Sequence, residues 1–146
     1  MSCDTPAPLR RALASTSVPG DPLMTNIDEQ GVRATLQLYL DGAREGDVDK
    51  VRRSFHPQAR MSGFLQGQSL VGGPEPYYEA VTNAPPPAKS GEPYQAEITH
   101  LAVAERVASA TLVESSYLGM HFTTFFHLLK IGGNWQIISK TFMHHQ

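Results

Sequence analysis

The chain has 146 residues, a formal net charge of −2 and 40% hydrophobic residues. This size and apolar content suit one domain with one hydrophobic core, so a second domain is not expected. The twelve basic residues form no clustered stripe, so a nucleic-acid partner is not expected either.

The chain has a single cysteine, Cys3, which excludes an intramolecular disulfide and a thiolate metal cluster. This cysteine usage fits a reducing compartment. Residues 1–24 lack the continuous apolar run of a secretory signal, and no later stretch reaches membrane-spanning length. We therefore expect a cytoplasmic protein that has no membrane partner.

The first 24 residues are rich in Pro, Ser, Thr and Gly. Such a composition buries too little apolar surface to offset the entropy of ordering, so residues 1–24 are predicted to be a flexible tail. Met24 is an alternative start to Met1. Residues 25–146 are predicted to form the single domain.

Three helices are expected in the first part of this domain. Asn26 is a candidate cap for the first, because Glu29 follows at capping-box spacing and apolar residues then recur at helical intervals. Asp47 is a candidate cap for the second helix, which is expected to run to Pro57. A third helix is predicted after Gly73, with Pro74 in its first turn.

Strands are expected to complete the domain. A small hairpin is predicted over residues 59–73, which contain several glycines, and a loop is predicted over the proline-rich residues 84–93. Longer strands are predicted over residues 94–104, 107–117, 121–130 and 136–144. Because the helices come first in the chain and the antiparallel strands last, the order of elements indicates an α+β fold in which the helices pack on one face of a curved sheet.

The last two strands suggest a pocket. A turn at Gly132-Gly133 pairs Lys130 with Trp135, and the two-residue period of a strand then assigns the faces. One face would carry large apolar side chains around three hydroxyl groups, which is the composition of a small-molecule site. Its pocket candidates are Phe122, Thr124, Phe126, Trp135, Ser139 and Thr141.

The opposite face, with Lys140, mixes His and Lys with aromatics and suits a subunit interface. The other interpretation is that the hydroxyls bond to the backbone and the aromatics fill the core.

His56 is the candidate acid/base and a candidate ligand contact. It lies in the stretch FHP, and an imidazole can transfer protons near neutral pH. The alternative is that its ring bonds to a backbone group and fixes the turn before Pro57. Tyr39 and Tyr78 are further candidates for the pocket. After Glu114 the chain has no Asp or Glu, so the last hairpin offers no carboxylate base.

No metal site and no cofactor are expected. His121 and His127 share a strand face but lie roughly 20 Å apart along the strand, too far to hold one ion. The stretch GQSLVGG lacks the strand, the spacing and the Lys of a phosphate-binding loop.

The stretches YLDGAREGD, FHPQARMSG and FTTFFHLLKIGGNWQIISKTFMHH occur in this order in the chain. Together they resemble the nuclear transport factor two-like superfamily, and most of all its small bacterial members described as putative lumazine-binding or SnoaL-like. The resemblance covers residues 25–146. It implies a cone with a cystatin-like fold, in which a strongly curved, mostly antiparallel sheet wraps around three helices. It also implies a pocket at the mouth and a homodimer through the outer sheet face.

Members of this superfamily include ligand binders, dehydratases, isomerases and cyclases, so the fold does not decide the function. An acidic residue is frequent in the family at the position of Thr124, and Asn is usual at the position of Ser139, so chemistry that needs both is not expected here. We expect a binding protein for a small apolar or ring-containing molecule. The alternative is a cofactor-independent isomerase, dehydratase or cyclase that uses His56 as acid/base. A third interpretation is a scaffold whose interior is filled by aromatic side chains.

Overall fold

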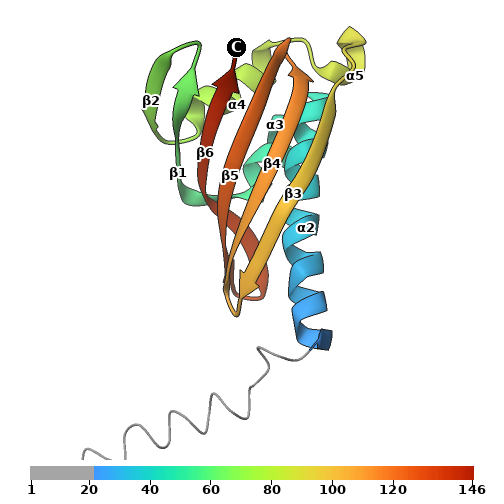
Figure 1. Cartoon of the computed structure of the whole chain (residues 1–146), viewed down its shortest axis with the longest axis vertical. Helices are drawn as coiled ribbons and strands as arrows, with labels where there is room; N and C mark the ends of the chain where they lie inside the picture. Colours follow the sequence, from blue (N-terminus) through green and yellow to red (C-terminus); the bar gives the residue numbers. More distant parts are fainter. Residues whose placement is uncertain (1–21) are drawn as a thin grey trace, which may run out of the picture.

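The structure is a computed structural model that describes residues 22–146. It confirms the α+β class, with helices packed on a curved six-stranded sheet (Figure 1). The helices are α2 (Pro22–Glu45), α3 (Val48–Ser54), α4 (Glu75–Asn83) and the four-residue α5 (Pro87–Ser90). The strands are β1 (Phe55–Leu65), β2 (Gln68–Gly72), β3 (Gln95–Ala104), β4 (Val107–Tyr117), β5 (Met120–Ile131) and β6 (Asn134–His145).

The sheet has the strand order β2-β1-β6-β5-β4-β3. All neighbours are antiparallel except β1 and β6, which are parallel. Helix α2 contacts both β3 and β6 although β4 and β5 separate these strands, so the sheet curves around the helix. Figure 1 shows α2 running along the sheet. The cone implied by the resemblance is therefore present.

Helix α2 begins earlier than the sequence indicates. It starts at Pro22, so Asn26 lies inside the helix and the predicted cap is wrong. Proline is favoured at the start of a helix, because the N–H group that it lacks would have no partner there. Residues 1–21 of the predicted tail lie outside the described residues. No helix within residues 22–146 has the length and apolar character needed to cross a membrane.

Helix α3 begins as predicted but ends early. The Asp47 carboxylate accepts hydrogen bonds from the backbone N–H groups of Asp49 and Lys50, which confirms the cap. The helix ends at Ser54, and Phe55 is already extended and opens β1. The residue before a proline disfavours helical backbone, so the chain leaves the helix ahead of Pro57.

The later elements follow the predicted ranges closely. Strand β4 has the predicted bounds, and the ends of β3, β5 and β6 differ from the prediction by at most two residues. The hairpin over residues 59–73 is present, although β1 extends back to Phe55. The predicted loop over residues 84–93 contains the short helix α5.

The turn between β5 and β6 has the predicted register at its tip. Lys130 pairs with Trp135, which confirms the turn at Gly132-Gly133. Further along, the register shifts, because Leu128 pairs with Ile137 whereas the preceding His127 pairs with Ser139. Ile138 is therefore an extra residue on β6, a β-bulge.

The bulge at Ile138 reverses the faces of the second half of β6. Side chains alternate between the two faces of a strand, so one inserted residue moves every later side chain to the other face. Ser139 and Thr141 therefore lie on the outer face, and their predicted place in the pocket is wrong. Lys140, predicted on the outer face, is buried on the inner one together with Phe142.

Candidate functional site

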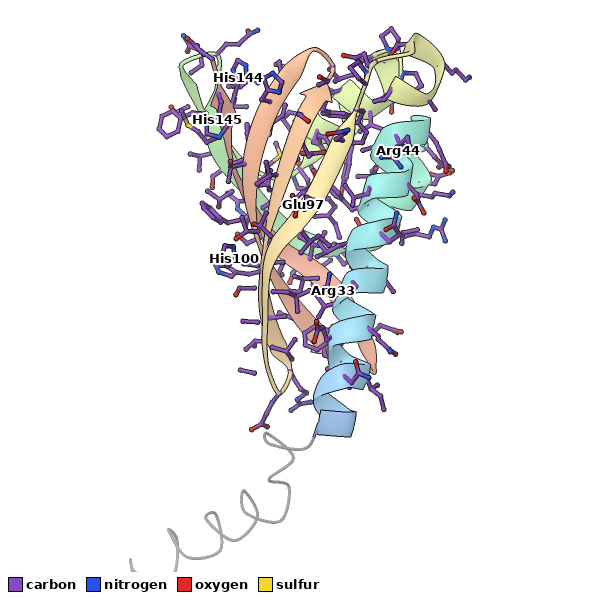
Figure 2. The ribbon with its side chains drawn as sticks, turned by 45° about the vertical axis from the view of Figure 1, so that its right-hand side comes forward. Arg33, Arg44, Glu97, His100, His144 and His145 are labelled. Carbon is purple, nitrogen blue, oxygen red and sulfur yellow. The ribbon has the colours of Figure 1, made fainter. Side chains whose placement is uncertain are left out.

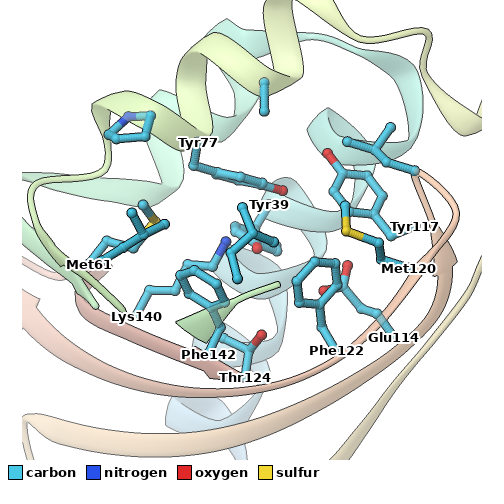
Figure 3. Close-up of a pocket in the computed structure, with 15 residues that line it drawn as sticks. Tyr39, Met61, Tyr77, Glu114, Tyr117, Met120, Phe122, Thr124, Lys140 and Phe142 are labelled. Carbon is cyan, nitrogen blue, oxygen red and sulfur yellow. The ribbon is translucent and has the colours of Figure 1, made fainter. Parts of the chain in front are cut away.

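A cavity of about 110 Å³ lies between the sheet and helices α2 and α4. Figure 3 shows Tyr39 and Tyr77 reaching it from the helices and Glu114, Thr124 and Lys140 reaching it from the sheet. The wall is mostly apolar and aromatic. It consists of Tyr39, Met61, Leu65, Leu70, Pro76, Tyr77, Ala80, Glu114, Tyr117, Leu118, Met120, Phe122, Thr124, Lys140 and Phe142.

One end of this cavity reaches the surface. Pro76 is exposed, and Leu70, Leu118 and Met120 are half-buried. Residues at the other end, such as Thr124, are almost completely buried. A small molecule could therefore enter past the apolar rim and come to rest among the aromatic rings.

Lys140 is the most unusual residue of the wall, because only 5% of it is exposed. Its Nζ atom lies 3.4 Å from the centre of the Tyr77 ring, 5.2 Å from that of Tyr39 and 5.5 Å from that of Phe142. Within residues 22–146 this amine has no hydrogen bond and no salt bridge. Burial lowers the pKa of the Lys140 amine to about 7, against the opposing effect of the negative charge of Glu114. The amine is therefore poised between its charged and neutral forms near neutral pH.

Glu114 supplies the second titratable group of the wall. The residue is 3% exposed, and its carboxylate accepts a hydrogen bond of 2.5 Å from the hydroxyl of Tyr94. Burial raises the pKa of Glu114, while this hydrogen bond and the charge of Lys140 oppose the rise. The two groups do not form a salt bridge with each other. Glu114 is thus a carboxyl group that can hold a proton closer to neutral pH than an exposed glutamate can.

Two hydroxyl groups of the wall lack a close hydrogen-bond partner among the described residues. Tyr77 Oη and Thr124 Oγ1 are buried and have no hydrogen bond of 3.5 Å or less to any of them, although Tyr77 lies near enough to Tyr39 and Tyr117 to oppose the rise that burial causes in the pKa of both hydroxyls. Burial also raises the pKa of Tyr77 well above its ordinary value, so its hydroxyl stays protonated and can donate. Leaving such a group unpaired costs about 1–3 kcal/mol. A ligand oxygen between these groups would remove that cost.

The structure places only some of the predicted pocket residues in the cavity wall. Tyr39, Phe122 and Thr124 line the cavity, whereas Phe126 and Trp135 are buried outside its wall. The Phe126 ring packs edge-on against Tyr39, with 5.1 Å between ring centres. The Trp135 ring fits against α2, where a Cβ atom on Gly31 would lie 2.6 Å from its Cδ1. These two rings are core residues.

Tyr78 lies outside the cavity wall as well. Its ring packs beneath the guanidinium group of Arg52, 4.4 Å from the ring centre, and edge-on against Phe55. The neighbouring Tyr77 faces the cavity instead. The prediction of Tyr78 in the pocket is therefore wrong, because packing sets the rotation of α4 about its axis and turns the adjacent Tyr77 to the cavity.

His56 also lies away from the cavity. It alternates with the buried Phe55 along β1, so its ring points to the opposite side of the sheet. Its Nδ1 atom accepts a hydrogen bond of 2.9 Å from the backbone N–H of Gln58. This is the structural role that the sequence offered as the alternative to acid/base chemistry. On the same outer side, the hydroxyl of Thr141 shares a hydrogen bond of 3.2 Å with that of Ser62.

Glu114 and Lys140 are not among the site residues that the sequence predicts. A signal for Glu114 is present, because the bounds predicted for β4 are correct and alternation places it on the same face as Ala110 and Leu112, which are buried. No such signal exists for Lys140, because nothing in the local pattern reveals the bulge at Ile138. Within residues 22–146, no three His, Cys, Asp or Glu side chains lie close enough to hold a metal ion.

Comparison with known proteins agrees with this architecture. Residues 27–143 match the family described as Putative lumazine-binding. The aldolase FrzH of a Cladobotryum species is 26% identical over 120 residues, which cover 82% of this chain and 93% of that protein.

Comparison with solved structures supports the same fold. An NTF2-like protein of unknown function from Shewanella baltica OS155 is 26% identical, with a TM-score of 0.73 over 82% of this chain and 94% of the other. A domain of unknown function with a cystatin-like fold, from Nostoc punctiforme PCC 73102, shares the fold at 18% identity, with a TM-score of 0.64 over 84% and 80% of the two chains. The chain therefore belongs to the Putative lumazine-binding family, within the nuclear transport factor two-like superfamily.

Proposed function

We propose that this protein binds a small, mostly apolar, ring-containing molecule in the cavity between the sheet and helices α2 and α4. The observation that carries the proposal is an aromatic cavity in which two hydroxyl groups, those of Tyr77 and Thr124, have no hydrogen bond of 3.5 Å or less to any residue within 22–146. Its volume of about 110 Å³ is close to that of an engineered cavity of roughly 150 Å³ that binds benzene. A single ring that carries a carbonyl or hydroxyl oxygen suits this volume and these donors.

Blocking the cavity is expected to abolish binding. Single-ring carbonyl compounds, such as benzaldehyde, acetophenone and cyclohexanone, are tested by saturation-transfer NMR on the intact chain. Ala80 lies in the wall on α4, so Ala80→Phe fills the cavity and is expected to remove the transfer signal. Glu79→Phe is the matched control, because Glu79 is exposed on the same helix and lies outside the wall. Equal signals from the two variants would contradict binding in this cavity.

A second candidate function is cofactor-independent acid–base catalysis on a carbonyl compound. Glu114 and Lys140 support it, because burial moves the pKa of both groups toward neutrality, where proton transfer is most effective. These groups take the place of His56, which lies outside the cavity wall. The similar protein FrzH is described as an aldolase, and aldol chemistry begins with proton removal next to a carbonyl group.

Proton exchange next to the carbonyl group tests this candidate. The protein is expected to accelerate exchange of the ring protons of cyclohexanone that adjoin the carbonyl group with deuterium from the solvent, followed by NMR. Glu114→Gln keeps the shape but removes the base, and the rate is expected to fall by about 100-fold. Exchange no faster than in buffer would eliminate this candidate and leave the binding proposal intact.

We also propose that the protein is a homodimer through the outer sheet face, in a cytoplasmic setting. Several large apolar side chains are exposed on this face, among them Val113, Met143 and Phe125, which is 54% exposed. Figure 2 shows His100 on this side, away from α2. A mixed apolar and polar surface of this kind is typical of a subunit interface.

Sedimentation equilibrium tests the dimer. The unmodified chain is expected to have the mass of two chains, and Phe125→Glu is expected to have the mass of one, because it buries an unpaired charge in the interface. Ile27→Glu serves as control, since Ile27 is similarly exposed but lies on α2. A single-chain mass for the unmodified protein would contradict the dimer.

A further inference from the structure

We propose that Lys140 is a nucleophile, whose Nζ atom condenses with a small aldehyde or ketone in the cavity to form a Schiff base. The inference rests on the proposed function, because the carbonyl compound must first enter this cavity. It assigns a covalent role to a residue that the family resemblance and the sequence pattern did not single out.

The contacts of Lys140 compensate only in part for the burial of its charge, because three aromatic rings surround Nζ and burial still lowers the pKa of the amine. A buried lysine normally has a carboxylate partner, because an unpaired charge in an apolar interior is strongly destabilising. The carboxylate in the same cavity wall, Glu114, is instead hydrogen-bonded to Tyr94 and forms no salt bridge with Lys140. The amine faces aromatic rings and open cavity (Figure 3). It is thus free to react with a molecule held there.

The surroundings favour both the attack and its product. Near pH 7 a large fraction of this amine is neutral, the form that attacks a carbonyl carbon. The protonated Schiff base that forms is a cation at the position of the former ammonium group. The face of Tyr77 and the nearby Glu114 stabilise a cation at this position. The aromatic wall therefore suits an iminium ion as well as it suits an amine.

The remaining groups of the wall can move the protons. The nitrogen forms a bond to the carbonyl carbon, and the carbinolamine oxygen then takes up a proton and leaves as water. Overall, an ammonium group and a ketone give an iminium ion and one water molecule, so charge and atoms balance. Glu114 is the proposed proton carrier, and the hydroxyls of Tyr77 and Thr124 are the proposed donors to the carbinolamine oxygen. The substrate class is a small aldehyde or ketone with an apolar body.

Reductive trapping tests this inference. The intact protein is incubated at pH 7 with cyclohexanone or benzaldehyde and sodium cyanoborohydride, and peptide mapping by mass spectrometry locates the adducts. The expected product is Lys140 with an added mass equal to the carbonyl compound less one oxygen atom. Lys50, Lys89 and Lys130 are internal references within the same chain. Because an ordinary lysine is less than about 0.1% neutral at pH 7, Lys140 is expected to be labelled at least ten times faster than these.

Two further measurements separate this inference from the binding proposal. Lys140→Arg keeps a cation but cannot form the adduct, so the Lys140 label is expected to disappear while the reference lysines react as before. If NMR shows binding in the cavity but Lys140 is labelled no faster than Lys50, the inference is overturned and the binding proposal stands. If no carbonyl compound binds and Lys140 remains unlabelled, both fail together. Mapping of the unmodified chain decides the question even where a variant folds poorly.

Discussion

Lys140→Met is expected to stabilise the protein at pH 7, raising its free energy of unfolding by roughly 2–4 kcal/mol. Methionine has a similar length and no charge, so it fills the same space against Tyr77 and Phe142. The difference between the ordinary lysine pKa of 10.5 and the value of about 7 in the fold bounds the gain, at about 1.4 kcal/mol per pKa unit. Because Lys140→Met also loses the contacts between the ammonium group and the aromatic rings, the gain in stability is smaller than this bound.

The gain is expected to depend on pH in a defined direction. Because the folded-state pKa of Lys140 lies below that of the unfolded chain, the unfolded state binds more protons between pH 7 and 10.5. The stability contribution of Lys140 is therefore lowest below pH 7 and rises as the pH approaches 10.5. The advantage of Lys140→Met should be complete below pH 7 and shrink towards pH 10.5, as measured by urea unfolding at several pH values.

Lys130→Met on the neighbouring strand is the matched control. Lys130 Nζ lies 2.8 Å from Asp28 Oδ1 in a half-buried salt bridge between β5 and α2. Its removal leaves a carboxylate without its partner, so this variant is expected to be slightly less stable at pH 7. Destabilisation by Lys140→Met at pH 7 would show instead that the amine contributes to the fold.

Gly63→Ala is expected to destabilise the protein by about 3 kcal/mol or more. Gly63 on β1 pairs with Phe142 on the parallel strand β6. A Cβ atom at this position would lie 2.2 Å from the carbonyl oxygen of Phe142 and 2.7 Å from its ring. The oxygen belongs to the backbone of a central strand and cannot move without disturbing the ladder, so the strands must separate locally. Thermal and urea unfolding measure the loss.

This substitution is also expected to weaken binding, because Phe142 lines the cavity. Gly72→Ala at the end of β2 provides the control, since a Cβ atom there would meet no atom within 4 Å. Its stability should stay within about 0.5 kcal/mol of the unmodified chain. If both alanine variants unfold at the same urea concentration, the close packing between β1 and β6 does not limit stability.

Much of this fold could be predicted from the sequence, because its signals are local. The recurrence of apolar residues at helical intervals predicts a buried face of α2, and Val32, Leu36 and Tyr39 on that face are all buried. The cap at Asp47 and the turn at Gly132-Gly133 were also correct, since each depends on a few neighbouring residues. The periodic patterns and the motif order were sufficient for the α+β class and the family resemblance.

The candidate site was decided by the tertiary structure. Because of the bulge at Ile138, Lys140 and not Ser139 lies on the inner face of β6. Packing of α4 turns Tyr77 rather than Tyr78 towards the cavity. Glu114 gained its role through Tyr94 on the adjoining segment, a partner 20 residues away. Periodicity specifies that a strand has two faces, but the curvature of the sheet and the pairing between strands determine which residues reach the interior. In this protein, local sequence patterns are enough to predict the elements and their order, whereas an amine and a carboxyl group meet in one apolar cavity because of the way the sheet assembles.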